Sequence, residues 1–98
     1  MKRKGTVIVM YDAPAEADDW MHGPHYEEVE RTPGVTEVRR YELVQGPEGC
    51  RKYLALIESD DIDATVNWRS SPEGQRSQAE ANERGVTNRY GMVSKRIY

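Results

Sequence analysis

Hydrophobic positions near the start of the chain fall first in a dense run and then at the wider spacing of a helix. Residues 5–11 are rich in β-branched and aromatic side chains and predict a buried strand. A proline-containing break at 12–14 ends this strand, and a helical composition follows. Because proline disrupts a helix interior and a Gly-Pro pair lies at 23–24, the pattern predicts two helical pieces, at about 15–22 and 24–31.

The rest of the chain predicts a hairpin, two further helices and a last strand. Residues 35–44 and 50–58 have strand composition and flank a glycine- and proline-containing turn, which favours an antiparallel hairpin. Helices are expected at about 61–70 and 72–84, each preceded by residues that cap helix N-termini. The second of these is almost entirely polar and is expected on the outside. Residues 86–98 predict a fourth strand.

The resulting order, β-α-β-β-α-β over residues 1–98, predicts a single α+β domain of the split β-α-β, ferredoxin-like kind. A chain of 98 residues is long enough to bury one core without disulfides or a structural metal. In this arrangement the helices cover one face of the sheet, and the other face needs cover. A second copy of the chain is the simplest cover, so a homodimer is expected.

Composition argues against two classes of binding partner for this domain and favours one cellular location. The net charge is -3, and the chain lacks the aromatic signature of RNA-recognition domains, so no nucleic-acid partner is expected. No apolar run approaches the roughly 18 residues of a membrane-spanning helix, and no membrane partner is expected. Cys50 is the only cysteine, which fits a reducing compartment and makes the cytoplasm the expected location.

Three short segments within residues 5–60 form a recognisable set. They are Asp19-Trp20-Met21-His22-Gly23-Pro24-His25-Tyr26, then Pro33-Gly34-Val35 with Arg39-Arg40-Tyr41, and finally Tyr53-Leu54-Ala55-Leu56-Ile57-Glu58. In this order and spacing they resemble EthD-like proteins, whose first helix carries Asp-Trp-Tyr-x-x-Glu-His and whose third strand carries Tyr-Leu-Ala-hydrophobic-x-Glu.

The resemblance implies a dimeric α/β barrel, in which two sheets pack face to face and each subunit keeps a cavity between its sheet and its helices. Proteins of that architecture include cofactor-free monooxygenases, polyketide cyclases, dehydratases, decarboxylases, isomerases and dehalogenases, as well as haem-handling proteins. His25 matches the family's histidine. Pro24 stands where the family often has an acid, and Glu27 where it often has proline. The carboxylate that would orient the histidine is therefore absent from its usual place.

The candidate catalytic residues are His25, Tyr11 and Arg40. A histidine accepts or donates a proton near neutral pH, so His25 is the expected general acid/base. Tyrosine hydroxyls such as that of Tyr11, or the Arg40 guanidinium, can stabilise an oxyanion that develops in a substrate. The alternative for His25 is a surface or capping role. For the strand arginines Arg39 and Arg40, pairing across the sheet with Glu37, Glu42 or Glu58 is the more common role.

Polar-tipped aromatic residues form the candidate substrate-binding set. The chain contains no phenylalanine, and tyrosine hydroxyls and indole N–H groups each need a partner when buried. A cavity that binds an aromatic or polyketide-like molecule suits such residues. The set is Trp20, His22, Tyr41, Tyr53, Trp68 and Tyr90. Packing in the core or at a subunit interface explains the same residues equally well.

Metal chemistry is not expected. Asp18, His22 and His25 have the Asp-x3-His-x2-His spacing, which would place three ligands on one face of an unbroken helix. The predicted helix break at 23–24 removes that geometry. Cys50 opens a strand without a histidine nearby in sequence, so it is not expected to act as a nucleophile.

Two functions fit these features. The first is a cofactor-independent enzyme that moves a proton at a carbon atom of an aromatic or polyketide-like substrate, by lyase chemistry (cyclase, dehydratase, decarboxylase or isomerase type) or by cofactor-free monooxygenation. The second is a non-catalytic accessory protein that binds a small apolar molecule in the same cavity.

Overall fold

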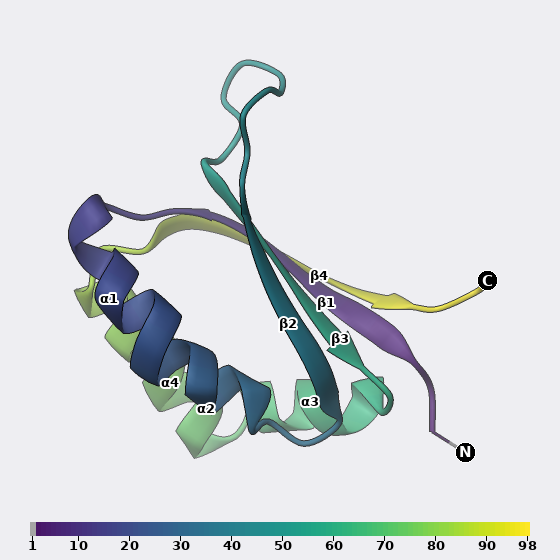
Figure 1. Cartoon of the computed structure of the whole chain (residues 1–98). Helices are drawn as coiled ribbons and strands as arrows, with labels where there is room; N and C mark the ends of the chain where they lie inside the picture. Colours follow the sequence, from purple (N-terminus) through teal and green to yellow (C-terminus); the bar gives the residue numbers. More distant parts are fainter. Residues whose placement is uncertain (1) are drawn as a thin grey trace.

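The computed structural model, which describes residues 2–98, consists of one antiparallel sheet with its helices packed against a single face (Figure 1). The strands are β1 (Gly5–Asp12), β2 (Val35–Glu42), β3 (Tyr53–Ser59) and β4 (Thr87–Lys95), in the spatial order β2-β3-β1-β4. This order and the β-α-β-β-α-β sequence of elements confirm the predicted ferredoxin-like α+β fold.

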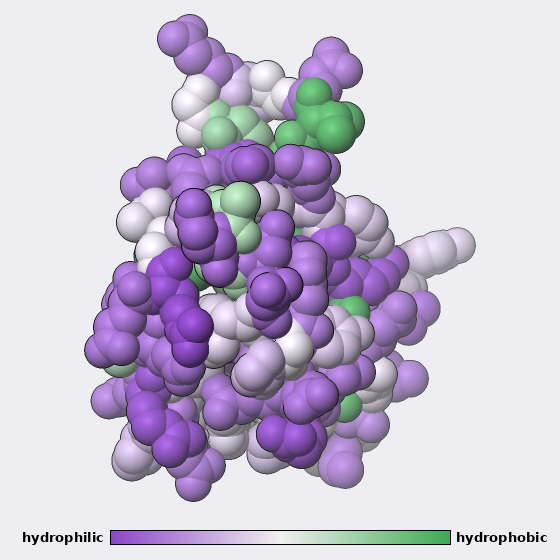
Figure 2. All heavy atoms as spheres, turned by 60° about the vertical axis from the view of Figure 1, so that its left-hand side comes forward, coloured by the Kyte–Doolittle hydropathy of each residue, from purple (hydrophilic) through white to green (hydrophobic). Residues whose placement is uncertain are grey.

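The helical layer consists of one long stretch before β2 and two helices between β3 and β4. The long stretch comprises η1 (Ala15–Ala17), α1 (Asp18–Trp20), η2 (Met21–His25) and α2 (Tyr26–Glu30), and the later helices are α3 (Ile62–Arg69) and α4 (Pro72–Glu83). Among residues 2–98, no helix has both the length and the hydrophobicity of a membrane span. The side of the molecule that carries the helices is largely hydrophilic (Figure 2).

The predicted break at Gly23-Pro24 was wrong. The chain stays helical from Ala15 to Glu30, and the proline lies within the π-helical segment Met21–His25 (Figure 1). A π-turn widens the backbone ring to i→i+5 bonding, and this wider spacing tolerates a residue that has no backbone N–H. His25 therefore lies within a helix, not just after a break.

The two predicted strands of the hairpin, 35–44 and 50–58, were also too long on the side of their connecting loop. β2 ends at Glu42 and β3 begins at Tyr53, so residues 43–52 form a loop that projects beyond the sheet (Figure 1). Val44 in this loop is 94% exposed. Asp12 holds the base of the loop, because its carboxylate accepts hydrogen bonds from the Lys52 amide and the Asn88 side chain.

Strand alternation divides the sheet into two different faces. On the helix-covered face, Val7, Val9 and Tyr11 of β1 are buried opposite Ile57, Ala55 and Tyr53 of β3. The residues between them form the face that no helix covers, which we call the open face. Its members are Thr6, Ile8, Met10, Glu37, Arg39, Tyr41, Leu54, Leu56, Glu58, Tyr90, Met92 and Ser94.

Small residues let α4 approach the core despite its polar sequence. Gly74, Ser77 and Ala81 are buried, while most other α4 residues are exposed, as expected for an outer helix. A Cβ atom at Gly74 would lie 2.3 Å from the backbone oxygen of Trp68. This close contact sets the angle between α3 and α4, and thereby the position of the last α3 residues.

Candidate functional site

A cavity of about 100 Å³ lies between the helix-covered face of the sheet and the helices. Its apolar wall comes from Val9, Met21, Val29, Val38, Ala55, Ile57, Trp68, Ala81 and Val86. Its polar lining comes from Tyr11, His25, Tyr26, Arg40, Arg69, Ser77, Gln78 and Arg89. An apolar chamber with a few polar groups is typical of a small-molecule site, although this one is smaller than the roughly 300 Å³ at the lower end of such sites.

His25 lies in the wall of this cavity. Its imidazole stacks on the Trp20 indole with 4.4 Å between ring centroids and an interplanar angle of 22°. Its Nδ1 atom is buried and has no hydrogen-bond partner in the described part of the chain. Burial lowers the pKa of His25, although nearby Glu28 and Glu80 oppose this shift. The ring is therefore held in place by stacking and is neutral at physiological pH.

Arg40 of β2 occupies the upper wall of the cavity with only 14% of its side chain exposed. Its Nε donates to the Tyr11 hydroxyl at 2.5 Å, and its guanidinium carbon lies 4.2 Å from the centre of the Tyr53 ring. Asp18 Oδ1 is 3.6 Å from Arg40 Nη1, and the same nitrogen contacts His22 Nε2. Arg40 Nη2 is buried and unpartnered among residues 2–98, so one donor remains available for a ligand.

The Tyr11 hydroxyl is tied to Arg40. Burial raises the pKa of Tyr11, and the hydrogen bond from Arg40 acts in the opposite direction. Tyr11 therefore stays protonated at neutral pH, and its O–H can donate to an oxygen in the cavity while its oxygen accepts from Arg40.

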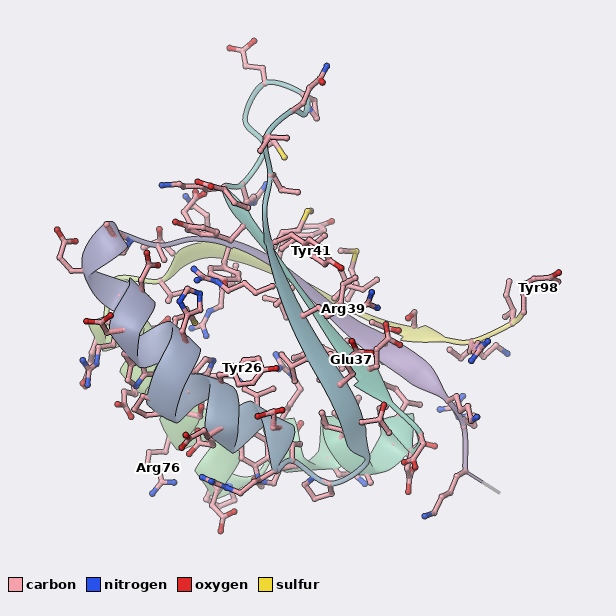
Figure 3. The ribbon with its side chains drawn as sticks, viewed as in Figure 1. Tyr26, Glu37, Arg39, Tyr41, Arg76 and Tyr98 are labelled. Carbon is pink, nitrogen blue, oxygen red and sulfur yellow. The ribbon has the colours of Figure 1, made fainter. Side chains whose placement is uncertain are left out.

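Tyr26 reaches the cavity from α2. It points toward the sheet, and its hydroxyl donates to the backbone oxygen of Val38 at 3.1 Å (Figure 3). This bond joins α2 to β2 and closes one side of the cavity. Tyr26 ends the first segment of the EthD-like resemblance but was not among the residues predicted to bind a substrate.

The structure brings some of the predicted binding residues to the cavity and separates others from it. Trp68 lines it, whereas Trp20 and Tyr53 are buried just behind His25 and Arg40. His22 is exposed on the outer side of Arg40.

Tyr41 and Tyr90 lie apart from this group. They belong to the open face, with 42% and 54% exposure, and so do not contribute to the cavity. Figure 3 shows Tyr41 beside Glu37 and Arg39 along β2, away from the helices. The physical reason is strand alternation, which puts Tyr41 on the opposite face from Arg40. Arg39 pairs with Glu37 and Glu58 on this open face, as the ion-pair alternative for the strand arginines predicted.

Arg69 and Arg89 line the cavity and were not predicted from the sequence. Arg69 is the last residue of α3, and Arg89 lies on β4 beyond a shift in register between β1 and β4. Side chains alternate between the two faces of a strand, so Arg89 lies on the same face as Val93. This alternation was the one feature of the sequence that could have identified Arg89.

The residues weighed as metal ligands have other contacts. Asp18 and His22 both contact Arg40, and His25 stacks on Trp20. Within residues 2–98, no three His, Cys, Asp or Glu side chains are grouped as a metal site requires.

Comparisons with known proteins identify the fold. No family model matches the chain, and no curated protein matches it in sequence. A solved EthD family protein from Bacillus halodurans is 17% identical and superposes with a TM-score of 0.67 over 96% of this chain and 99% of that one. SnoaB, a cofactor-independent oxygenase from Streptomyces nogalater, is 16% identical, with a TM-score of 0.68 over 98% and 95% of the two chains.

A third solved structure is described as a dimeric ferredoxin-like protein of unknown function, from Jannaschia sp. CCS1. It is 18% identical, with a TM-score of 0.65 over 92% of this chain and 96% of that one. Together these structures confirm the ferredoxin-like fold and the predicted resemblance to EthD-like proteins. At such identities the fold is what is shared, and the activity has to be argued from the cavity.

Proposed function

We propose that this protein is a cofactor-independent enzyme of the monooxygenase type that acts on a small aromatic or polyketide-like molecule. The observation that carries this proposal is the neutral, stacked imidazole of His25 in the wall of an apolar cavity, with Nδ1 unpartnered among residues 2–98. A neutral imidazole in an apolar site accepts a proton from a bound substrate, which is the role of a general base.

The proposed reaction converts a substrate CH₂ group, or an aromatic C–H beside a phenol, into a carbonyl. His25 removes an acidic proton, and the resulting electron-rich carbanion or phenolate reduces O₂ and forms a C–O bond to it. The hydroperoxide then loses water, so one oxygen atom stays in the product and the other leaves as H₂O. The substrate supplies the electrons, which makes a redox cofactor unnecessary.

Arg40 and Tyr11 complete the proposed site. The negative charge of the substrate anion develops on an oxygen atom, and the unpartnered Nη2 of Arg40 supplies a charged donor for it. The Tyr11 hydroxyl accepts from Arg40 Nε and keeps the guanidinium in place. In this proposal Trp68 packs against the substrate ring, because it lines the cavity.

A second candidate is a non-catalytic protein that binds a small molecule in the same cavity. Two observations favour it. No carboxylate orients His25 through Nδ1 in the described part of the chain, and a volume of about 100 Å³ accommodates little more than one aromatic ring without movement of side chains. His25 substitution separates the two candidates, since a binding protein keeps its affinity and has no turnover to lose.

We also propose that the open face binds a second copy of the chain. Ile8, Leu56 and Met92 are in register across three strands and form an aliphatic stripe that no helix covers. The solved dimeric ferredoxin-like protein described above has the same fold, which supports this homodimer. The single, exposed Cys50 supports the cytoplasm as the proposed location, because a free thiol is stable in a reducing compartment.

The test uses 1,8-dihydroxyanthrone, whose CH₂ group is acidic and whose oxidation to the quinone changes its absorbance. Because it has three fused rings, its binding requires side chains of the cavity wall to move. Wild-type protein is expected to consume one O₂ per quinone formed. His25→Ala is expected to lower turnover by about 10² to 10⁴ while dissociation constants for the anthrone stay within a few fold, because the ring moves a proton and does not supply the binding surface.

His22→Ala is the matched comparison, since it removes an exposed imidazole outside the cavity. It is expected to change turnover by less than about tenfold. Full turnover in His25→Ala would contradict the general-base role. Tight anthrone binding by the wild type without O₂ consumption would support the non-catalytic candidate instead.

A further inference from the structure

Arg69 and Arg89 meet at the cavity wall from two different elements. Arg69 ends α3 and Arg89 comes from β4. Within residues 2–98 the Arg69 guanidinium makes neither a hydrogen bond nor an ion pair. Arg89 donates only to the backbone oxygen of Gln78, at 3.3 Å, and to the side-chain oxygen of Asn82. Most of the donors of these two guanidinium groups are therefore free.

No negative charge of the protein balances this pair. No Asp or Glu lines the cavity in the described part of the chain. The nearby carboxylates of Glu28 and Glu80 are bound to other arginines, with 3.9 Å from Glu28 to Arg76 and 3.5 Å from Glu80 to Arg84. Figure 3 shows Arg76 on the outer side of the helical layer, away from the sheet.

The two arginines also carry like charges at the wall of the same cavity. Burial lowers the pKa of Arg69, and the charge of Arg89 lowers it further. Burial alone lowers the pKa of Arg89. Two like charges beside an apolar chamber are unfavourable unless an anion lies between them. An anionic ligand would provide the missing counter-charge.

We propose that Arg69 and Arg89 form a site for the carboxylate of a ligand whose apolar or aromatic body fills the cavity. This inference rests on the proposed function, because it names the substrate class of the same cavity. The guanidinium fork matches the paired oxygens of a carboxylate. A carboxylate is favoured over a phosphate because its single charge costs less to desolvate beside mainly apolar walls than the nearly double charge of a phosphate.

The position of this site defines how the ligand lies. Arg69 and Arg89 are on the side of the cavity formed by α3, α4 and β4, whereas Arg40 comes from β2. Arg69, Arg89 and His25 line the same small cavity. A carboxylate bound to the two arginines therefore places the adjacent ring near His25, and the Arg40 donor remains for a second oxygen of the same ligand.

The test compares benzoate with benzamide, which have nearly the same shape and differ in charge. Affinities are measured by NMR titration of the full chain at constant ionic strength. Wild-type protein is expected to bind benzoate about tenfold more tightly than benzamide or better, since hydrogen bonds to a charged group are stronger than neutral ones. The double variant Arg69→Met with Arg89→Met is expected to lose most of this preference, with only the Arg40 guanidinium left to favour the charged probe.

Arg76→Met is the control, because it removes an exposed arginine outside the cavity lining. It is expected to keep the benzoate preference. The double variant Arg69→Lys with Arg89→Lys keeps the charges and tests the site if the methionine variants fail to fold; it is expected to retain a smaller preference.

Each outcome separates the two proposals. Equal binding of benzoate and benzamide by the wild type would overturn the carboxylate site while leaving the cavity as a ligand site. A preference that survives undiminished in the methionine double variant would also overturn it. Failure of both probes to bind would contradict the cavity itself, and with it the proposed function.

Discussion

The two faces of the sheet are built from alternate residues of the same strands, yet their chemistry differs. Beneath the helices, β1 and β3 present Tyr11 and Tyr53, whose rings contact the guanidinium of Arg40. On the open face the neighbouring positions are Met10 and Leu54, which offer no hydrogen-bonding group. The helix-covered face thus fixes its polar groups around a cavity, whereas the open face combines an aliphatic stripe with polar and charged side chains such as Arg39 and Glu58.

This difference indicates two kinds of partner. Polar groups fixed in an apolar cavity select a particular small molecule, because each unpaired donor or acceptor penalises a ligand that leaves it unsatisfied. A flat aliphatic stripe favours a partner whose surface has a complementary shape and excludes water. A second protein surface has these properties. The three predictions below test the comparison between the faces.

The largest effect is expected from placing a carboxylate on each face of β3. Ile57→Asp buries a charge among the helices and should destabilise the fold by more than about 4 kcal/mol. Leu56→Asp, one residue away, points to the open face and should keep the fold but dissociate the homodimer. Circular dichroism with thermal unfolding measures the first effect, and light scattering after size-exclusion chromatography measures the second.

The interpretation of the faces would be wrong if the two variants behaved alike. A wild-type protein that is monomeric at micromolar concentration would contradict the proposed homodimer directly. Ile57→Val, which removes one methylene from the core without adding charge, is the control and should cost about 0.5–1.5 kcal/mol.

A smaller effect is expected from removing one tyrosine hydroxyl on each face. Tyr11→Phe leaves Arg40 Nε without its acceptor beside the cavity and should cost about 1–3 kcal/mol of unfolding free energy. Tyr41→Phe removes only an exposed contact with Arg39 and should cost less than about 0.5 kcal/mol. Urea unfolding at a fixed protein concentration measures the loss of unfolding free energy in both variants. Equal losses would contradict the interpretation that tyrosine hydroxyls stabilise the fold only on the helix-covered face.

The smallest effect is a pH dependence that belongs to the helix-covered face alone. Burial lowers the pKa of His25, so the folded chain binds this proton more weakly than the unfolded chain, whose histidine has a pKa of about 6.5. The contribution of His25 to stability is therefore fully present above pH 6.5. It decreases as the pH falls through the lowered pKa, by at most about 1.4 kcal/mol per pH unit.

Urea unfolding at pH 7.5 and pH 5.5 measures this dependence. His25→Gln should lose less stability than the wild type between these two values, since it lacks the titrating ring. If both proteins lost the same free energy, the imidazole would not be desolvated in the folded state, and the proposed neutral base would lose its support.

The motifs located the catalytic candidates better than they located the binding residues. His25 stands out because it matches the histidine of EthD-like proteins, Arg40 because it belongs to the Arg-Arg-Tyr segment of the same resemblance, and both line the cavity. Tyr41 and Tyr90 were grouped with Tyr11 by residue type alone. Residue type does not report which face a side chain occupies, and the structure places those two on the open face.

The sequence could not identify Arg69 and Arg89 as cavity residues, for a different reason. Their proximity depends on where α3 ends, on the contact of Gly74 with Trp68, and on the register shift between β1 and β4. Each of these is a tertiary feature. A charged residue at the end of a helix and one on an edge strand otherwise resemble ordinary solvent-exposed positions.

The sequence by itself determined the order of strands and helices, because hydrophobic periodicity and turn residues are local properties. It also determined that one face of each strand differs from the other. The tertiary structure alone decided that the helix continues through Pro24, and which arginines converge on the cavity. These outcomes depend on packing between segments far apart in sequence, and no local pattern contains that information.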